Sequence, residues 1–129
     1  MAPRISEGNM GINPYSFVRP RDPEPEPVAT LTGAADAIDI TVGNVFVLNR
    51  TGAVNAATLA APSATDEGRV IWISNGTTQA NTITVAGGLG GSGGTDDLLT
   101  FTNRTAANVT LRAFNLSWYL VGQYLTTVT

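Results

Sequence analysis

The sequence predicts an all-β domain, a sandwich or jelly roll of about eight short antiparallel strands behind an extended proline-rich N-terminal arm. From Val28 onward, apolar residues recur with a period of two rather than the 3.6 of a helix. Thr and Val, which favour pleated surfaces, are frequent in these runs, and turn residues separate the runs at short intervals. All but one of the seven prolines lie within residues 1–27. We therefore place the arm at residues 1–28 and the β-domain at residues 29–129.

The arm combines proline, charge and isolated apolar residues. From Arg19 to Pro27, proline alternates with charged residues. Proline fixes φ and biases the preceding residue toward extended backbone, so this stretch is expected to be semi-rigid and polyproline-like. A disordered tail seldom carries apolar anchors, so we expect the arm to contact a surface. The residues assigned to this contact are Arg4, Ile5, Ile12, Tyr15, Phe17, Val18, Arg19 and Arg21.

The β-domain divides into short runs bounded by turn residues. Apolar and polar residues alternate from 38 to 42, and Gly43-Asn44 is a candidate two-residue hairpin turn into Val45–Leu48. Further strands are predicted at residues 57–61, 69–74, 82–86, 98–102, 107–114 and 117–124.

An Asn-x-Thr turn recurs three times, each time between two strand candidates. The turns begin at Asn49, Asn75 and Asn103. A further asparagine follows each turn, and these residues are Asn55, Asn81 and Asn108. Asparagine tolerates left-handed backbone and hydrogen-bonds its own turn. Because three unlike copies are few for a solenoid, we interpret the repeat as convergent turn chemistry.

Three predicted strands are apolar on both faces, at residues 45–48, 70–73 and 118–121. A small free sandwich is expected to alternate, with one face in water. Either something covers the outer face, the arm or a neighbouring subunit, or these are simply central strands. The residues assigned to the core or to an oligomer interface are Phe46, Trp72, Trp118 and Tyr119.

The amino-acid composition excludes several classes of function. The chain has no Cys, His or Lys, and its net charge is −3. Thiol and histidine-based nucleophile systems are therefore excluded, and the negative charge argues against nucleic acid as a partner. No run approaches the roughly 18 apolar residues of a membrane span, and the N-terminus lacks the apolar run of a secretory signal. We expect a non-enzymatic protein, made in a cytoplasm, with no cofactor, metal or membrane partner.

Two local motifs favour loops over sites. Residues 88–93 match GxGxxG, but a turn and a strand follow instead of the helix that would hold a pyrophosphate. Asp96-Asp97 could ligate calcium, although the EF-hand spacing is absent and adjacent acids in a loop are usually solvated. A carboxylate pair for glycoside hydrolysis stays open, since such a pair depends on spatial separation rather than sequence spacing.

Four motifs follow one another in the C-terminal part of the chain: GRVIWISN at 68–75, NTITV at 81–85, VTL at 109–111 and SWYLVG at 117–122, with a glycine-rich loop after the second. This order resembles the β-sandwich domains of tailed-bacteriophage structural proteins, found in head decoration (cement) proteins and in fibre tips. The resemblance implies a homotrimer on the outside of the virion, bound to the major capsid protein.

The arm separates the two phage interpretations. A fibre tip normally follows a long shaft, whereas cement proteins often reach between capsid subunits with an extended N-terminal arm. We therefore expect a decoration protein that binds the capsid through the arm residues named above and stabilises the shell. The alternative is a fibre tip or a receptor- or glycan-binding module, and a small hydrolase ranks third.

Overall fold

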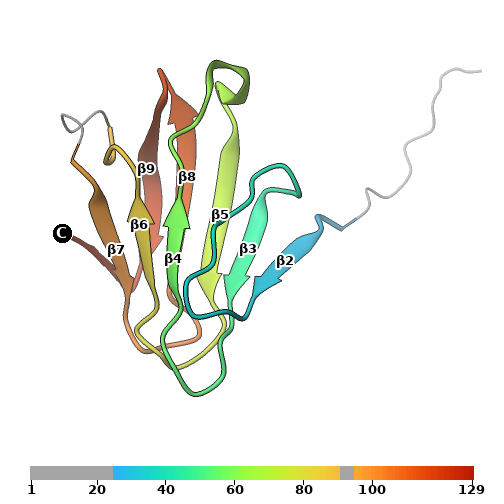
Figure 1. Ribbon diagram of the computed structural model, residues 1–129, viewed down its shortest axis with the longest axis vertical. Helices are drawn as coiled ribbons and strands as arrows, with labels where there is room; N and C mark the ends of the chain where they lie inside the picture. Colours follow the sequence, from blue (N-terminus) through green and yellow to red (C-terminus); the bar gives the residue numbers. More distant parts are fainter. Residues whose placement is uncertain (1–24, 91–94) are drawn as a thin grey trace, which may run out of the picture.

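The computed structural model describes residues 25–90 and 95–129, and within them the protein is nearly all β (Figure 1). The described strands are β2 (Val28–Leu31), β3 (Val45–Leu48), β4 (Ala56–Leu59), β5 (Val70–Asn75), β6 (Thr82–Val85), β7 (Asp97–Phe101), β8 (Asn108–Phe114), β9 (Ser117–Tyr124) and β10 (Thr126–Val128). A short 3₁₀ turn, η2 (Ala64–Asp66), lies between β4 and β5. The expected all-β class is confirmed.

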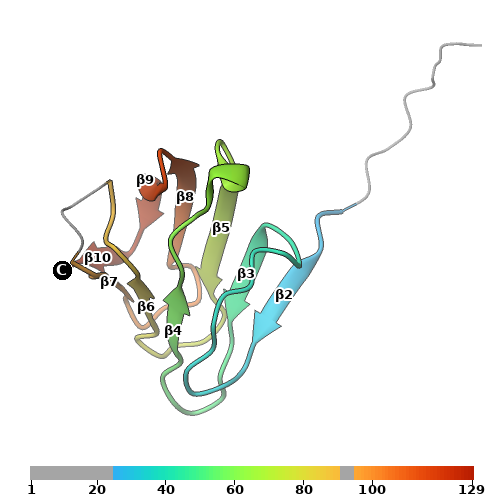
Figure 2. The same cartoon turned by 45° about the horizontal axis from the view of Figure 1, so that its top comes forward.

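The strands form two sheets around one core. Five strands lie in the order β2-β3-β5-β8-β9 and four in the order β10-β7-β6-β4, and Figure 2 shows the two layers. Alternate side chains of each strand point between the layers. The largest of these are fully buried, and they are Phe46, Leu48, Leu59, Ile71, Ile73, Ile83, Val85, Leu99, Phe101, Val109, Leu111 and Trp118.

Strand direction differs from the expectation. Strand β3 pairs in parallel with both β2 and β5, and β4 pairs in parallel with β6. The pairs β5–β8, β8–β9, β6–β7 and β7–β10 are antiparallel. The expectation of antiparallel strands throughout is therefore wrong. The chain crosses from the five-stranded to the four-stranded sheet after β3 and again after β5. The strands that precede the two crossings, β3 and β5, are neighbours and run in the same direction. The strands that follow them, β4 and β6, do the same in the other sheet.

The hairpin predicted at Gly43-Asn44 is also wrong. The strand that follows it, β3, has parallel partners on both sides. Ile38 lies beside the other sheet, where its N–H donates to the Thr58 carbonyl at 2.8 Å, and residues 40–42 form a turn. A Gly-Asn step between two alternating runs favours a hairpin locally, but here the first run turns after Ile38 and does not pair with β3.

The first two copies of the Asn-x-Thr repeat form equivalent crossings. The first connects β3 to β4, and the second connects β5 to β6 one strand further along each sheet. A buried hydrogen bond of 2.7 Å from the Asn55 N–H to the Asn81 side-chain oxygen joins the two crossings. The third copy connects β7 back to β8, from the four-stranded to the five-stranded sheet. Convergent turn chemistry therefore describes the third copy, whereas the first two are a structural repeat.

All six further predicted strands, β4 to β9, are present, and their bounds lie within two residues of the prediction. Two short strands, β2 and β10, were not predicted. Because β2 begins at Val28, the β-domain starts one residue before the predicted boundary. Leu125, with a φ of 52°, separates β9 from β10 and redirects the chain from one sheet to the other. A three-residue strand after such a turn leaves too short an alternation to detect.

At each side of the molecule a segment passes from one sheet to the other, and after β2 this segment hydrogen-bonds to β4, with the Ala56 N–H donating to the Ala34 carbonyl at 2.8 Å. At one side β9 continues into β10 of the opposite sheet, and Leu89 forms a parallel bridge with Trp118. At the other side β2 is an edge strand, and no strand in the described part of the chain pairs with its outer edge. Within that same part, no helix is long and apolar enough to cross a membrane.

Candidate functional site

The outer face of the five-stranded sheet carries several exposed or half-buried apolar side chains, with Thr110 and Arg112 of β8 among them. Its side chains alternate along each strand with the core residues, so they point away from the second sheet. We call this surface the Trp72 face and define it by Val28, Val45, Val47, Val70, Trp72, Phe114 and Tyr119.

Strand register places these side chains next to one another. Val28 pairs with Val45, and Val45 pairs with Trp72, so three apolar side chains stand side by side across three strands. The same row continues through Thr110 to Gly122. Because Gly122 lacks a side chain, the row becomes shallow beyond β8, and Trp72 is the largest side chain in it.

The face is uncovered by any residue that the structure describes. Exposed fractions are 46% for Trp72, 46% for Val70, 54% for Val28 and 56% for Phe114. At the β8–β9 end, the Phe114 and Tyr119 rings pack edge to face with centroids 5.7 Å apart. Exposed apolar side chains gathered on one sheet face make this face the candidate interaction surface.

Of the four residues assigned to the core or to an oligomer interface, two lie in the core and two lie on the outer face. Phe46 and Trp118 are fully buried, and the Trp118 indole N–H donates to the Ala60 carbonyl at 2.9 Å. Trp72 and Tyr119 lie on the outer face. The central position of β5 in its sheet does not explain the apolar outer face, because no described element packs over it.

Sequence reasoning missed several members of this face. Val28 was assigned to the arm, and Phe114 was given no role. Period two places Val70 on the same side as Trp72, so the strand alternation was a signal for it. No comparable signal identified Val28, because β2 was not recognised as a strand.

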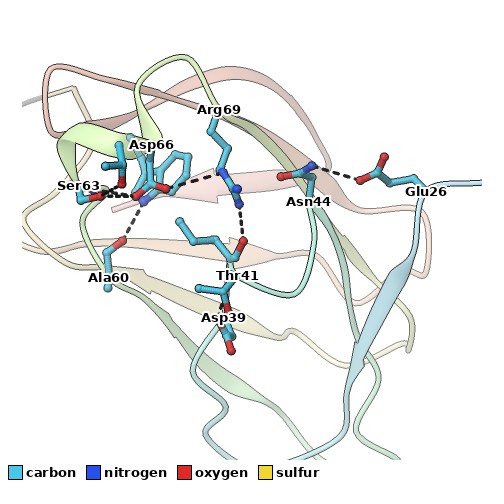
Figure 3. Close-up of polar contacts among 11 residues, drawn as sticks. Glu26, Asp39, Thr41, Asn44, Ala60, Ser63, Asp66 and Arg69 are labelled. Atoms are coloured by element: carbon cyan, nitrogen blue, oxygen red, sulfur yellow. Dashed lines mark hydrogen bonds and ion pairs between the residues drawn. The ribbon is translucent and has the colours of Figure 1, made fainter.

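The residues assigned to shell contact lie outside the described residues. They are Arg4, Ile5, Ile12, Tyr15, Phe17, Val18, Arg19 and Arg21. The described chain enters the domain at the edge of the Trp72 face, where the Asn44 side-chain amide donates to the Glu26 carboxylate at 3.2 Å (Figure 3).

The loop motifs have structural partners. The Asp96 carboxylate accepts the Gly87 N–H at 2.9 Å, and the Asp97 carboxylate accepts the Leu89 N–H at 2.7 Å. Both acids therefore tie β7 to the turn after β6. Strand β7, not a helix, follows the glycine-rich segment, as expected from the sequence. Residues 91–94 of that segment lie outside the described residues, and in the described ranges no group of three His, Cys, Asp or Glu residues suits a metal ion.

Polar contacts around η2 anchor the loops beside the sheet (Figure 3). The Asp66 carboxylate accepts both the N–H and the hydroxyl of Ser63 at 2.9 Å. These hydrogen bonds, the backbone one first, lower the pKa of Asp66. Arg69 donates to the Ile40 carbonyl and approaches Asp66 at 3.8 Å. The pKa of Asp39 is lowered in the same way, by the hydroxyl and N–H of Thr41. These charges hold loops in place and converge on no cleft.

No pocket is present over residues 25–90 and 95–129, so the candidate site is a surface. No protein-family model matches the chain, and no curated protein matches it. The candidate site therefore rests on the geometry of the apolar face.

Proposed function

We propose that this chain is a structural decoration (cement) protein of a bacteriophage head, a β-sandwich domain that binds the outside of the shell through its N-terminal arm and stabilises it. In this proposal the protein is a homotrimer on the virion, its partner is the major capsid protein, and it has no catalytic role. The observation that carries the proposal is the uncovered Trp72 face. A domain with a broad apolar sheet face suits permanent residence in an assembly better than free solution.

The arm supplies the attachment. Prolines at 20, 23, 25 and 27 restrict the free chain, so less conformational entropy is lost when the arm is bound. Its apolar residues then bury area against the shell, at roughly 25 cal/mol per Å². Its arginines offer forked donors that match carboxylates.

Several arms on one oligomer strengthen the attachment. If the geometry allows simultaneous contact, linked arms raise avidity by about 10²–10⁴-fold over one arm. A ligand that binds the assembled shell and not its separated subunits stabilises the assembly by mass action. The proposal therefore predicts that the protein raises the temperature at which shells disassemble.

Deletion of residues 1–24 tests this function, because it leaves the domain from Pro25 onward intact. We expect the truncated protein to keep the circular dichroism spectrum of the full chain and to lose co-sedimentation with shells that lack this protein. A full-length variant with Tyr15→Ser and Phe17→Ser is the matched control for arm length, and it should also lose most of its binding. Unchanged affinity of the truncated protein would show that the arm is only a linker.

A second candidate is a receptor- or glycan-binding module. The observation that favours it is the exposed Trp72 ring on the same face as the Phe114–Tyr119 pair, because aromatic rings on a sheet can stack against sugars. Glycan binding that is lost in Trp72→Ser, combined with unchanged shell binding, would select this candidate.

A further inference from the structure

Arg112 stands among apolar and aromatic side chains within the Trp72 face. It pairs with Val70 of β5 on one side and with Tyr119 of β9 on the other. Phe114 lies two positions further along β8, and Trp72 is the diagonal neighbour of Arg112 on β5, within reach of a long side chain. Among the five described strands of this sheet, Arg112 is the only charged residue. It is exposed and has no ion-pair partner in the part of the chain that the structure describes.

The chain carries an acidic, proline-rich segment directly before this sheet. Residues 20–24 read Pro-Arg-Asp-Pro-Glu, in which two prolines have the P-x-x-P spacing, and we call them the acidic segment. They lie outside the described residues, and the described chain begins at Pro25, beside the edge strand β2 of the same sheet (Figure 1). Segments with this spacing bind surfaces lined with aromatic rings, because proline already restricts their backbone. Asp22 and Glu24 supply the charge opposite to that of Arg112.

The chain between the acidic segment and β2 is long enough for contact within one molecule. Asp22 precedes Val28 by six residues, and six residues of polyproline-like backbone span about 19 Å. Strand β8, which carries Arg112, lies three strands from β2 in the sheet order, a separation of about 14 Å. The covalent tether also holds the acidic segment near the face at an effective concentration on the order of 1 mM. A weak contact is therefore enough to keep the segment on the face.

We propose that the acidic segment docks on the Trp72 face of its own chain, with Asp22 and Glu24 around Arg112 and proline rings against Trp72. The carboxylates give the guanidinium forked hydrogen bonds, and the prolines cover apolar area that is otherwise in water. Docking fixes the base of the arm, so less conformational entropy is lost when the rest of the arm binds a partner. The apolar residues assigned to shell contact precede this segment in the chain. The docking can therefore fail while shell binding by the arm stands.

The fluorescence of Trp72 reports this docking in the full-length protein. Trp118 is fully buried and its indole N–H is hydrogen-bonded to Ala60, so added acrylamide reaches Trp72 far more readily. The described residues alone leave Trp72 46% exposed, and a docked segment shields it. We therefore expect acrylamide to quench Trp72 weakly in the wild type and strongly when the docking is broken.

Charge exchange breaks and restores the contact. Arg112→Glu alone, or Asp22→Arg with Glu24→Arg, places like charges together, and each change should weaken docking by about tenfold or more and raise the quenching of Trp72. Combining both changes in one chain restores opposite charges and should recover most of the protection. Arg104→Glu is the matched control, because it makes the same charge change in the exposed β7–β8 turn, and it should leave quenching as in the wild type.

Three results would overturn the docking. The first is equal quenching of Trp72 in the wild type and in every variant, and the second is protection of the wild type only after shells are added, which would assign the face to the shell. The third uses the Arg112→Glu chain unfolded and refolded together with the chain that carries Asp22→Arg and Glu24→Arg. Neither chain can dock its own segment, so no protection is expected, and recovery would assign the segment to a neighbouring copy. All these variants keep the residues assigned to shell contact, so co-sedimentation with shells reports the proposed function separately.

Discussion

The two tryptophans stand in similar apolar runs and have different surroundings. Trp118 is fully buried and its indole N–H is hydrogen-bonded to Ala60, whereas Trp72 is 46% exposed on the outer face. Both neighbours of Trp72 are isoleucines, so the local sequence does not reveal which parity points inward. The packing of the second sheet decides this, and that packing depends on residues far away in the chain.

Replacing each tryptophan by alanine should separate the two roles. Trp118→Ala should lower the free energy of unfolding by about 3–5 kcal/mol, because it leaves a cavity and an unpaired carbonyl. Trp72→Ala should cost less than about 1 kcal/mol in the monomer, because the side chain is half exposed. Urea denaturation at a protein concentration low enough to keep the chain monomeric measures both changes in the free energy of unfolding. Equal losses would mean that the outer face is packed in the folded monomer.

At the scale of elements, the connections between the sheets depend on buried asparagines. The Asn81 amide donates to the Asn75 side-chain oxygen at 2.6 Å, and its own oxygen accepts the Asn55 N–H at 2.7 Å. All three residues are buried. Hydrogen-bonding groups in a core are costly without partners, so this network holds the two crossings in register.

Asn81→Ala removes the centre of this network. The buried Asn55 N–H and the Asn75 side-chain oxygen then each lose one hydrogen-bond partner. We expect a loss of about 2–4 kcal/mol in the free energy of unfolding. Asn103→Ala is the matched control, since Asn103 occupies the exposed turn of the third copy. It should change stability by less than about 0.5 kcal/mol. Similar losses at both positions would contradict a special role for the first two crossings.

The 3₁₀ turn η2 adds a pH dependence at low pH. Hydrogen bonds from Ser63 lower the pKa of Asp66 below its ordinary value of 3.8. The ionised carboxylate therefore stabilises the fold fully above that ordinary value, and the contribution is lost as the pH falls through the lower pKa of the folded state. Nuclear magnetic resonance titration of Asp66 should find the low pKa. Ser63→Ala, which keeps the N–H donor and removes the hydroxyl, should raise it part of the way. Titration of Asp66 at or above 3.8 in the wild type would refute this account.

At the scale of the whole molecule, a segment of the chain joins the two sheets at each side, and at the β2 side residues 34–38 hydrogen-bond along the outer edge of β4. The β9–β10 connection and the Leu89–Trp118 bridge join the sheets at one side. Strand β2 forms the edge at the other, directly after Pro25 and Pro27. Proline cannot donate a backbone hydrogen bond, so it limits further strand addition at such an edge. Residues 25–27 therefore enter the domain beside the edge strand of the sheet that carries the Trp72 face.

The sequence by itself determined the all-β class, most of the strands and the proline-rich composition of the arm. These follow from local signals, because a period of two and turn residues act over a few neighbours. It also singled out strands with two apolar faces, which led to Trp72. The pairing partners could not be read in the same way, since the alternation of a strand is identical whether its neighbour runs parallel or antiparallel.

The tertiary structure alone decided the direction of β3 and β4, the inward face of β5 and the row that joins Val70 to Arg112. Each of these depends on residues brought together from distant parts of the chain. The run at 38–42 shows the limit most clearly. Its alternation and the following Gly-Asn step favour a hairpin, yet Ile38 is hydrogen-bonded beside β4 of the other sheet and residues 40–42 form a turn. Long-range packing prevailed there because burying Ile38 between the sheets stabilises the fold more than a local turn preference does.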